Sequence, residues 1–290
     1  MTERPDVAPE LTNPRAERVK AVRALSGRSA RQRSGRFLAE GPQTVREAIL
    51  FARVRDVYVT AEAADRHGEI VETALERGLH VHPTADDVML AMSGDAQGIL
   101  AVVDHEPALL GDVLAAGPVL VAVLANVRDP GNAGTVIRAA DAAGADAVVL
   151  TQESVDVLNP KTVRATAGSL FHLPVVTGVT LEAAIASLRA AGLAVLATDG
   201  TGEHDLDDLL DVAGLARVAG RHAEISGDSR TPDLALPTAW VFGNEAWGLS
   251  AADRELADAV VRVPIRGQAE SLNLASAATV CLYASARSQR

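Results

Sequence analysis

From Pro118 to the end of the chain, short apolar runs alternate with helical segments. This alternation constrains the fold, because parallel strands are joined by crossover helices that cover both faces of their sheet. We therefore expect the second half of the chain to be an α/β domain with a mostly parallel sheet. Strands are predicted at residues 119–125, 145–150, 173–176, 193–198, 239–242 and 260–263, and helices at about 132–143, 160–170, 181–192, 250–258 and 271–287.

Two polar loops follow apolar runs near the C-terminus. In the first, Trp240-Val-Phe242 leads into Gly243-Asn-Glu-Ala-Trp-Gly-Leu249. In the second, Val260–Ile265 leads into Arg266-Gly-Gln-Ala-Glu-Ser-Leu-Asn273, and a helix follows. Polar loops that leave neighbouring strand ends of an α/β sheet form a ligand crevice. The pair predicts a binding site without identifying its ligand.

A third motif, Asn126-Val-Arg-Asp-Pro-Gly-Asn-Ala-Gly-Thr-Val-Ile-Arg-Ala-Ala140, lies upstream of both loops. In order, the motifs read Asn-x(5)-Asn-x-Gly-x(3)-Arg, then Gly-Asn-Glu-x-x-Gly-Leu, then Pro-x-x-Gly-x-x-Glu-Ser-Leu-Asn. Their order and spacing resemble the SpoU (TrmH-like) 2′-O-ribose methyltransferases of the SPOUT superfamily. The resemblance covers about residues 14–288, and it is more specific in the second half than in the first.

The resemblance implies an N-terminal α/β domain that binds the substrate and is similar to ribosomal protein L30e. It implies a C-terminal SPOUT domain with a trefoil knot, in which the segment after Gly243 threads a loop. It also implies S-adenosyl-L-methionine as the cofactor, and a homodimer with the last helix, Leu272–Ala286, in the interface. The expected organisation is a disordered leader over 1–12, the substrate-binding domain over 13–104, a linker over 105–117 and the methyltransferase domain over 118–290, with a mobile acidic insertion at about 218–236.

The first domain is predicted as a smaller strand–helix alternation. Asn13 is expected to cap a helix that starts at Pro14, and residues 26–35 are expected to form a basic loop. Strands are predicted at residues 37–41, 54–60, 80–82 and 98–103, and helices at 44–52, 68–77 and 86–92.

Methyl transfer from a sulfonium requires alignment of the methyl group with the attacking ribose oxygen, and help in removing the 2′-hydroxyl proton. The resemblance assigns catalytic roles to five residues, which are Arg138, Asn132, Glu245, Ser271 and Asn273. A guanidinium holds its proton tightly, so Arg138 acts either as a strongly perturbed base or as a clamp for phosphate or alkoxide. Asn132 is expected to cap the helix that carries Arg138. Ser271 and Asn273 are expected to cap the last helix and to face the cofactor or ribose.

For the cofactor, the resemblance points to backbone contacts around Gly243, Val263 and Leu272. It places Thr198, Ile265 and Leu274 beside them as supporting residues. Glycine allows a close approach of the backbone, and main-chain groups can bind an adenine edge. No Gly-x-Gly-x-x-Gly fingerprint follows a strand, so a Rossmann dinucleotide site lacks its main signature.

Charge is distributed unevenly along the chain. The net charge is −11, yet residues 14–36 contain eight basic residues and one acidic residue. A local concentration of cations favours phosphate binding, and the 2′-hydroxyl distinguishes RNA from DNA. The predicted RNA-binding residues are Arg28, Arg31, Arg33 and Arg36, together with Arg164, whose segment resembles the Arg-Ala-Ser-x-Gly segment of the family.

Composition excludes several other classes. The single cysteine, Cys281, rules out an internal disulfide, and the seven histidines show no metal-ligand spacing, so no metal is expected. No apolar run reaches the length of about eighteen residues that a membrane helix needs, and the N-terminus lacks a secretory pattern. We therefore expect a cytoplasmic protein.

The predicted function is S-adenosylmethionine-dependent methylation of a ribose 2′-hydroxyl, with 23S ribosomal RNA favoured by the two-domain organisation. Transfer RNA is the nearest alternative substrate. An RNA-binding protein that has lost catalysis and a small-molecule methyltransferase are the other classes considered. The five candidate catalytic residues argue against the former, and the basic segment argues against the latter.

Overall fold

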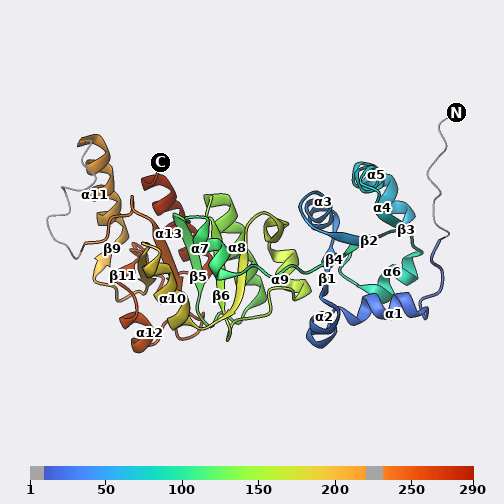
Figure 1. Cartoon of the computed structure of the whole chain (residues 1–290), viewed down its shortest axis with the longest axis horizontal. Helices are drawn as coiled ribbons and strands as arrows, with labels where there is room; N and C mark the ends of the chain where they lie inside the picture. Colours follow the sequence, from blue (N-terminus) through green and yellow to red (C-terminus); the bar gives the residue numbers. More distant parts are fainter. Residues whose placement is uncertain (1–9, 220–230) are drawn as a thin grey trace. The chain divides into compact units, whose positions relative to one another are not determined.

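The computed structural model describes residues 10–219 and 231–290, except for the side chains of 216–219. Two compact units are present (Figure 1). Unit 1 comprises Met1–Glu106 with Asp156–His172, and unit 2 comprises Pro107–Val155 with Leu173–Arg290. Each unit is an α/β structure built on its own sheet, as the sequence predicts.

Unit 1 contains a four-stranded sheet in the order β1-β4-β2-β3. Strand β4 runs antiparallel to β1 and β2, whereas β2 and β3 are parallel. Apolar side chains from α1 and α6 pack with Leu38, Tyr58 and Leu100 of the strands to form a core. The strands are β1 (Arg36–Glu40), β2 (Val54–Val59), β3 (His80–Pro83) and β4 (Ile99–Asp104). The helices are α1 (Glu17–Ala24), α2 (Arg28–Ser34), α3 (Pro42–Phe51), α4 (Ala61–Arg66), α5 (Gly68–Glu76), α6 (Asp86–Met92) and α9 (Pro160–Ala165), with the 3-10 turn η1 (Ser169–Phe171).

Several N-terminal expectations differ from the structure. The expected basic loop contains the helix α2, which ends at Gly35 in the left-handed conformation. The first helix starts at Glu17, and the Asn13 side chain instead accepts a hydrogen bond from the backbone N–H of Arg15. Of the expected leader, residues 1–9 lie outside the described part, and the Leu11 backbone pairs with Thr84.

Residues 156–172 group with unit 1, although the sequence suggested that they belong to the second domain. Polar and aromatic contacts explain this grouping, because Arg164 pairs with Glu40 of β1 and Phe171 stacks on Phe37 at 6.2 Å between ring centroids. The close approach of Gly168 to Glu47 leaves no space for a side chain at Gly168.

Unit 2 contains a seven-stranded sheet in the order β7-β6-β5-β10-β8-β11-β9, and every pair in it is parallel. The central strands are buried on both faces, which explains why they appear in the sequence as continuous apolar runs. The strands are β5 (Leu120–Leu124), β6 (Ala147–Thr151), β7 (Val175–Val179), β8 (Ala194–Thr198), β9 (His204–Asp205), β10 (Thr238–Phe242) and β11 (Ala259–Arg262). The predicted parallel sheet is confirmed.

Helices α7 and α10 pack on one face of this sheet, and α8 and α13 pack on the other. Helix α7 lies in the segment expected to be a linker, and α11 lies between the predicted strands at 193–198 and 239–242, where no helix was expected. The expected acidic insertion at about 218–236 falls largely on residues outside the described part. The helices are α7 (Leu110–Ala115), α8 (Pro130–Ala143), α10 (Leu181–Ala190), α11 (Leu206–Ala219), α12 (Ala251–Glu255) and α13 (Leu274–Ser288).

Candidate functional site

The candidate site lies at the carboxyl edge of the unit 2 sheet. Four consecutive strands of this sheet, in the order β5-β10-β8-β11, are parallel. The loops that follow them therefore leave from the same edge. The first motif follows β5, the second follows β10 and the third follows β11. The topology thus brings together three segments that lie far apart in the sequence, as expected for a crevice at strand ends.

The loop after β10 is closed by two backbone hydrogen bonds, from Asn244 N to Gly248 O at 3.0 Å and from Gly248 N to Asn244 O at 2.8 Å. Gly248 adopts a positive φ of 67°. A Cβ added at Gly243 would lie 2.4 Å from the carbonyl carbon of Gly248, so only glycine fits there. The buried Asn244 side chain donates from Nδ2 to the backbone oxygen of Asn126 at 2.7 Å, which ties this loop to the first motif.

One hydrogen-bonded chain of side chains joins all three motifs. Asn132 donates from Nδ2 to Glu245 Oε1 at 3.3 Å, and Asn273 donates from Nδ2 to Asn132 Oδ1 at 3.0 Å. The backbone N–H of Asp129 also donates to Glu245 Oε1 at 3.3 Å. The structure therefore brings together Asn132, Glu245 and Asn273, three of the five residues assigned to catalysis from the sequence. We call this set the three-motif network.

The capping of the two helices that supply this network differs from expectation in two respects, and one of them is that Ser271 does not cap α13. Asn273 caps α13, since its Oδ1 accepts from the backbone N–H of Ala275 at 2.9 Å. The prediction that Asn132 caps α8 is wrong. Asp129 is the cap, and its Oδ1 accepts from the backbone N–H of Asn132 at 2.8 Å. Because this bond uses only its backbone, the Asn132 side chain is available to the network.

The network borders a cavity of about 330 Å³, within the range typical of small-molecule sites. All six residues expected to bind the cofactor line this cavity, together with Glu245 and Ser271. Its lining mixes apolar side chains, backbone groups and carboxylates, which suits a ligand with an aromatic base at one end and charged groups at the other. The full lining is Thr198, Asp199, Gly200, Gly243, Asn244, Glu245, Ala246, Gly248, Val261, Val263, Ile265, Glu270, Ser271, Leu272, Leu274 and Ala277.

Asp199 was missed by the sequence analysis, although it directly follows β8 and lines the cavity. Burial tends to raise its pKa, but hydrogen bonds from Thr201 and the charge of Arg254 outweigh burial and hold the pKa below its usual value. Arg254 Nη1 lies 2.7 Å from Asp199 Oδ2, and Thr201 Oγ1 lies 2.6 Å from Oδ1. Asp199 is therefore an ionised carboxylate at the cavity wall, paired with the guanidinium of Arg254. Its position at the carboxyl end of a predicted strand was the available signal.

Arg138 and Ser271 do not join the three-motif network. Arg138 is exposed on α8, six residues beyond Asn132, so the two side chains project about 120° apart around the helix. Ser271 is exposed at the cavity wall.

The expected RNA-binding arginines occupy different environments. Arg28 and Arg33 are exposed on α2. Arg36 lies 3.5 Å from Asp104 with its side chain 40% exposed. Arg164 pairs with Glu40 and, at 2.8 Å, with Asp95, and its side chain remains 28% exposed.

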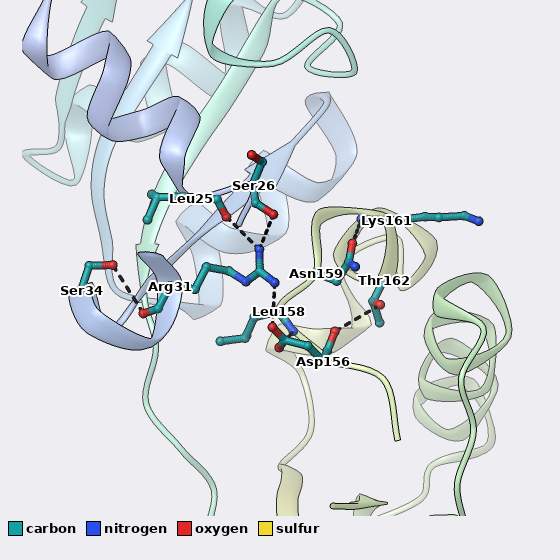
Figure 2. A network of polar contacts seen from close by, with 9 residues as sticks. All are labelled: Leu25, Ser26, Arg31, Ser34, Asp156, Leu158, Asn159, Lys161 and Thr162. Atoms are coloured by element: carbon teal, nitrogen blue, oxygen red, sulfur yellow. Dashed lines mark hydrogen bonds and ion pairs between the residues drawn. The ribbon is translucent and has the colours of Figure 1, made fainter. Parts of the chain in front are cut away.

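Arg31 does not fit the expectation of a phosphate contact, because its side chain is only 3% exposed. Figure 2 shows its guanidinium between the backbone of Leu25 and Ser26 and the side chain of Asp156. It contacts Asp156 Oδ2 at 2.7 Å and donates to the backbone oxygens of Leu25 at 2.9 Å and Ser26 at 2.7 Å. Arg31 is a structural residue that joins α2 to the segment preceding α9.

Arg53 and Arg55 are exposed cations that the sequence analysis missed. Arg53 lies 3.3 Å from the carboxylate of Asp104 and its side chain is 69% exposed. Arg55 lies 2.7 Å from the same carboxylate and its side chain is 45% exposed. Arg36 is the third arginine beside this single acid. One acid cannot neutralise three arginines, so this surface of unit 1 carries excess positive charge.

Metal and membrane features are absent from the described residues. Within residues 10–219 and 231–290, no group of three or more His, Cys, Asp or Glu side chains has the arrangement of a metal site. In the same ranges, no helix is long and apolar enough to cross a bilayer.

Comparison with protein families gives two matches that together span most of the chain. Residues 119–283 match the SpoU rRNA Methylase family. Residues 16–101 match the MRM3-like substrate binding domain.

Individual relatives are similar over nearly the whole length. The chain is 32% identical to the 23S rRNA (guanosine(2553)-2′-O)-methyltransferase of Bacillus subtilis, over 94% of this chain and 98% of the relative. It is 30% identical to the 23S rRNA (uridine(2479)-2′-O)-methyltransferase of Streptomyces viridochromogenes, over 98% and 94%. Among solved structures, an rRNA methyltransferase of Sinorhizobium meliloti with bound AdoMet aligns with a TM-score of 0.75 at 29% identity, over 96% of this chain and 97% of that one.

Proposed function

We propose a function for this chain from the premise that it belongs to the SpoU rRNA methylase family. It is an S-adenosyl-L-methionine-dependent methyltransferase that modifies a ribose 2′-hydroxyl in 23S ribosomal RNA. Relatives named as 23S rRNA methyltransferases are similar to this chain over nearly its whole length, and this supports ribosomal over transfer RNA.

The cofactor is proposed to occupy the cavity beside the three-motif network. When bound there, it supplies an activated methyl group on a sulfonium. Gly243 lets the backbone approach closely, and Val263 and Leu272 offer main-chain groups to the adenine edge. Thr198, Ile265 and Leu274 enclose the remainder. Asp199, which is paired with Arg254, lines the same cavity.

In the proposed reaction, S-adenosyl-L-methionine held in the cavity would supply the methyl group that the ribose 2′-oxygen accepts, and the 2′-hydroxyl proton would pass to solvent water. This chain aligns the partners and stabilises the developing charge, because a sulfonium leaving group needs no covalent help. Glu245, Asn132 and Asn273 hold one another in a fixed geometry and orient the ribose. Ser271 contributes a hydroxyl at the cavity wall. Arg138 binds the phosphate of the target nucleotide or stabilises the oxyanion.

The single observation that carries this proposal is the network from Glu245 through Asn132 to Asn273, built from all three motifs beside one cavity. A structural role alone would not require three exposed or half-buried polar side chains to converge at a cavity mouth. Such convergent polar groups at a strand-end pocket are typical of an active site.

For RNA binding we propose the exposed cations of unit 1, which are Arg28, Arg33 and Arg36 with Arg53 and Arg55, and the partly exposed Arg164. We further propose a homodimer through α13, which exposes Val280 (43%) and Tyr283 (46%). The knotted path after Gly243 and a cytoplasmic location are also proposed from family membership.

Mapping of 2′-O-methyl positions in ribosomal and transfer RNA, from cells with and without this protein, tests the function. We expect one 23S rRNA position to lose its methyl group when the protein is removed. A lost position in transfer RNA would redirect the proposal to that substrate. Unchanged maps of both RNAs would contradict it.

A further inference from the structure

Trp247 is an exposed aromatic side chain at the candidate site. The chain has two tryptophans. Trp240 is fully buried in β10 and donates from Nε1 to Ser285 Oγ at 2.9 Å, whereas Trp247 is 57% exposed in the loop after β10. Exposed apolar residues are common on proteins, so the exposure of Trp247 gains meaning only from its place in the second motif, two residues after Glu245.

The loop holds this ring in a defined place. The reciprocal backbone hydrogen bonds between Asn244 and Gly248 close the loop on either side of Trp247. A further bond from Ala246 N to Asn244 Oδ1 at 2.9 Å fixes the turn. The ring is therefore presented on a short, restrained support rather than on a long, free segment.

The ring lies next to the three-motif network but outside the cofactor cavity. Asn244, Glu245, Ala246 and Gly248 line that cavity, and Trp247 does not. The guanidinium carbon of Arg128 lies 5.4 Å from the centre of the Trp247 ring. Arg128 is also exposed, and it directly precedes Asp129, whose backbone N–H donates to Glu245. The pair thus lies within the first and second motifs, in residues that do not line the cofactor cavity.

We propose that Trp247 and Arg128 form a stacking platform for the nucleobase of the nucleotide whose ribose is methylated. This inference rests on the proposed function. Unpaired RNA bases are commonly held by stacking on aromatic rings and guanidinium planes, and every base has a face that suits such a platform. The methyl group is transferred to the ribose and not to the base. The base therefore needs a binding surface of its own beside the cofactor cavity. Arg128 adds a positive charge that favours the adjoining phosphate.

Steady-state kinetics of Trp247 variants test the platform. We expect Trp247→Ala to raise the KM for RNA by about 5- to 150-fold, the range that corresponds to loss of one stacked base. Trp247→Phe, which keeps an aromatic ring, should recover most of the affinity, whereas Trp247→Leu, which keeps only apolar bulk, should not. Leu215→Ala on α11 is the control, because Leu215 is a similarly exposed apolar residue (64%) outside the site.

Two further readouts separate a platform from a residue that only supports the loop. A supporting role would weaken cofactor binding, since the neighbours of Trp247 line the cofactor cavity, whereas a platform leaves the Kd for S-adenosylmethionine unchanged. RNA should also quench the fluorescence of Trp247 in the wild-type protein, and the Trp247→Phe variant, which retains only the buried Trp240, should show no such change.

An unchanged RNA KM in Trp247→Ala, or a parallel loss of cofactor affinity, would overturn the inference. Its failure is distinguishable from failure of the proposed function. If the wild-type protein transfers methyl groups to RNA and the alanine variant matches it, only the platform is refuted. If the wild-type protein transfers none, the proposed function itself fails.

Discussion

Gly243→Ala tests how the second motif builds the cofactor cavity. The new Cβ would lie 2.4 Å from the carbonyl carbon of Gly248, 2.6 Å from its oxygen and 2.6 Å from the backbone nitrogen of Leu249. All three atoms are backbone, so no side-chain rotation relieves the overlap. Favourable carbon contacts lie at about 3.5–4.0 Å, so the Asn244–Gly248 loop must shift by about 1 Å.

The magnitude follows from this displacement. Overpacking of a well-packed site costs about 1–3 kcal/mol. The Asn244–Gly248 loop lines the cavity through Asn244, Glu245, Ala246 and Gly248, so a shift of this loop changes the cavity proposed for the cofactor. If binding restores the original position of the loop, the full cost appears in the affinity, as a loss of about 5- to 150-fold for S-adenosylmethionine.

Isothermal titration calorimetry with S-adenosylmethionine measures this loss directly. Gly267→Ala is the matched control, because a Cβ at Gly267 meets nothing within 4 Å and its φ is not in the left-handed region. We expect the Kd to rise in Gly243→Ala and to stay at the wild-type value in Gly267→Ala. Wild-type affinity in Gly243→Ala, with the variant folded, would refute the close-approach argument.

Four further outcomes are expected. Arg138→Ala should abolish methyl transfer to RNA while calorimetry shows near-normal cofactor binding, and wild-type-like turnover would refute its catalytic role. Asn273→Ala removes a helix cap and a network bond, so kcat should fall more than tenfold and stability by about 1 kcal/mol, measured by denaturant unfolding. Arg31→Ala should lower the free energy of unfolding by about 3 kcal/mol, because it leaves Asp156 without its buried partner. The control Arg33→Ala changes an exposed side chain and should alter this free energy by under about 0.5 kcal/mol. Equal effects of the two substitutions would contradict the structural role of Arg31. Burial raises the pKa of the Cys281 thiol, so a thiol reagent at pH 8 should label the unfolded but not the native protein, and rapid native labelling would contradict its burial.

The unit 2 sheet was predictable because its strands are buried on both faces and appear as uninterrupted apolar runs. The candidate site was predictable for a related reason. Parallel strands place their following loops at one edge, so motifs more than a hundred residues apart, such as those of Asn132 and Asn273, were expected to meet. The network residues belong to motifs in these loops, whereas Thr198, which was also expected at the cofactor, ends β8 and belongs to none of the three motifs.

The errors lie where tertiary contacts override local pattern. Helix α2 is polar on all sides in sequence, and nothing in a run of arginines indicates that Arg31 alone is buried against Asp156. Helix α11 was not predicted from the sequence, because its segment is rich in acidic residues. Its buried residues Leu206, Leu209 and Ala213 nevertheless have the spacing of one helical face.

A smaller error at the site has a similar origin. Asn132 was expected to cap α8, but aspartate is as good a capping residue as asparagine, and Asp129 lies three positions earlier. In the structure, Asp129 takes the cap and Asn132 turns toward Glu245.

The most direct measurement of the central claim is methyl transfer in vitro from S-adenosylmethionine labelled with tritium in its methyl group. Purified protein is incubated with unmodified 23S rRNA, and the RNA is then hydrolysed in alkali. Alkaline cleavage needs a free 2′-hydroxyl, so a 2′-O-methylated ribose leaves its label in an alkali-resistant dinucleotide. We expect the label in one such dinucleotide with the wild-type protein and none with Arg138→Ala. Label released in mononucleotides would indicate base methylation and would contradict the account.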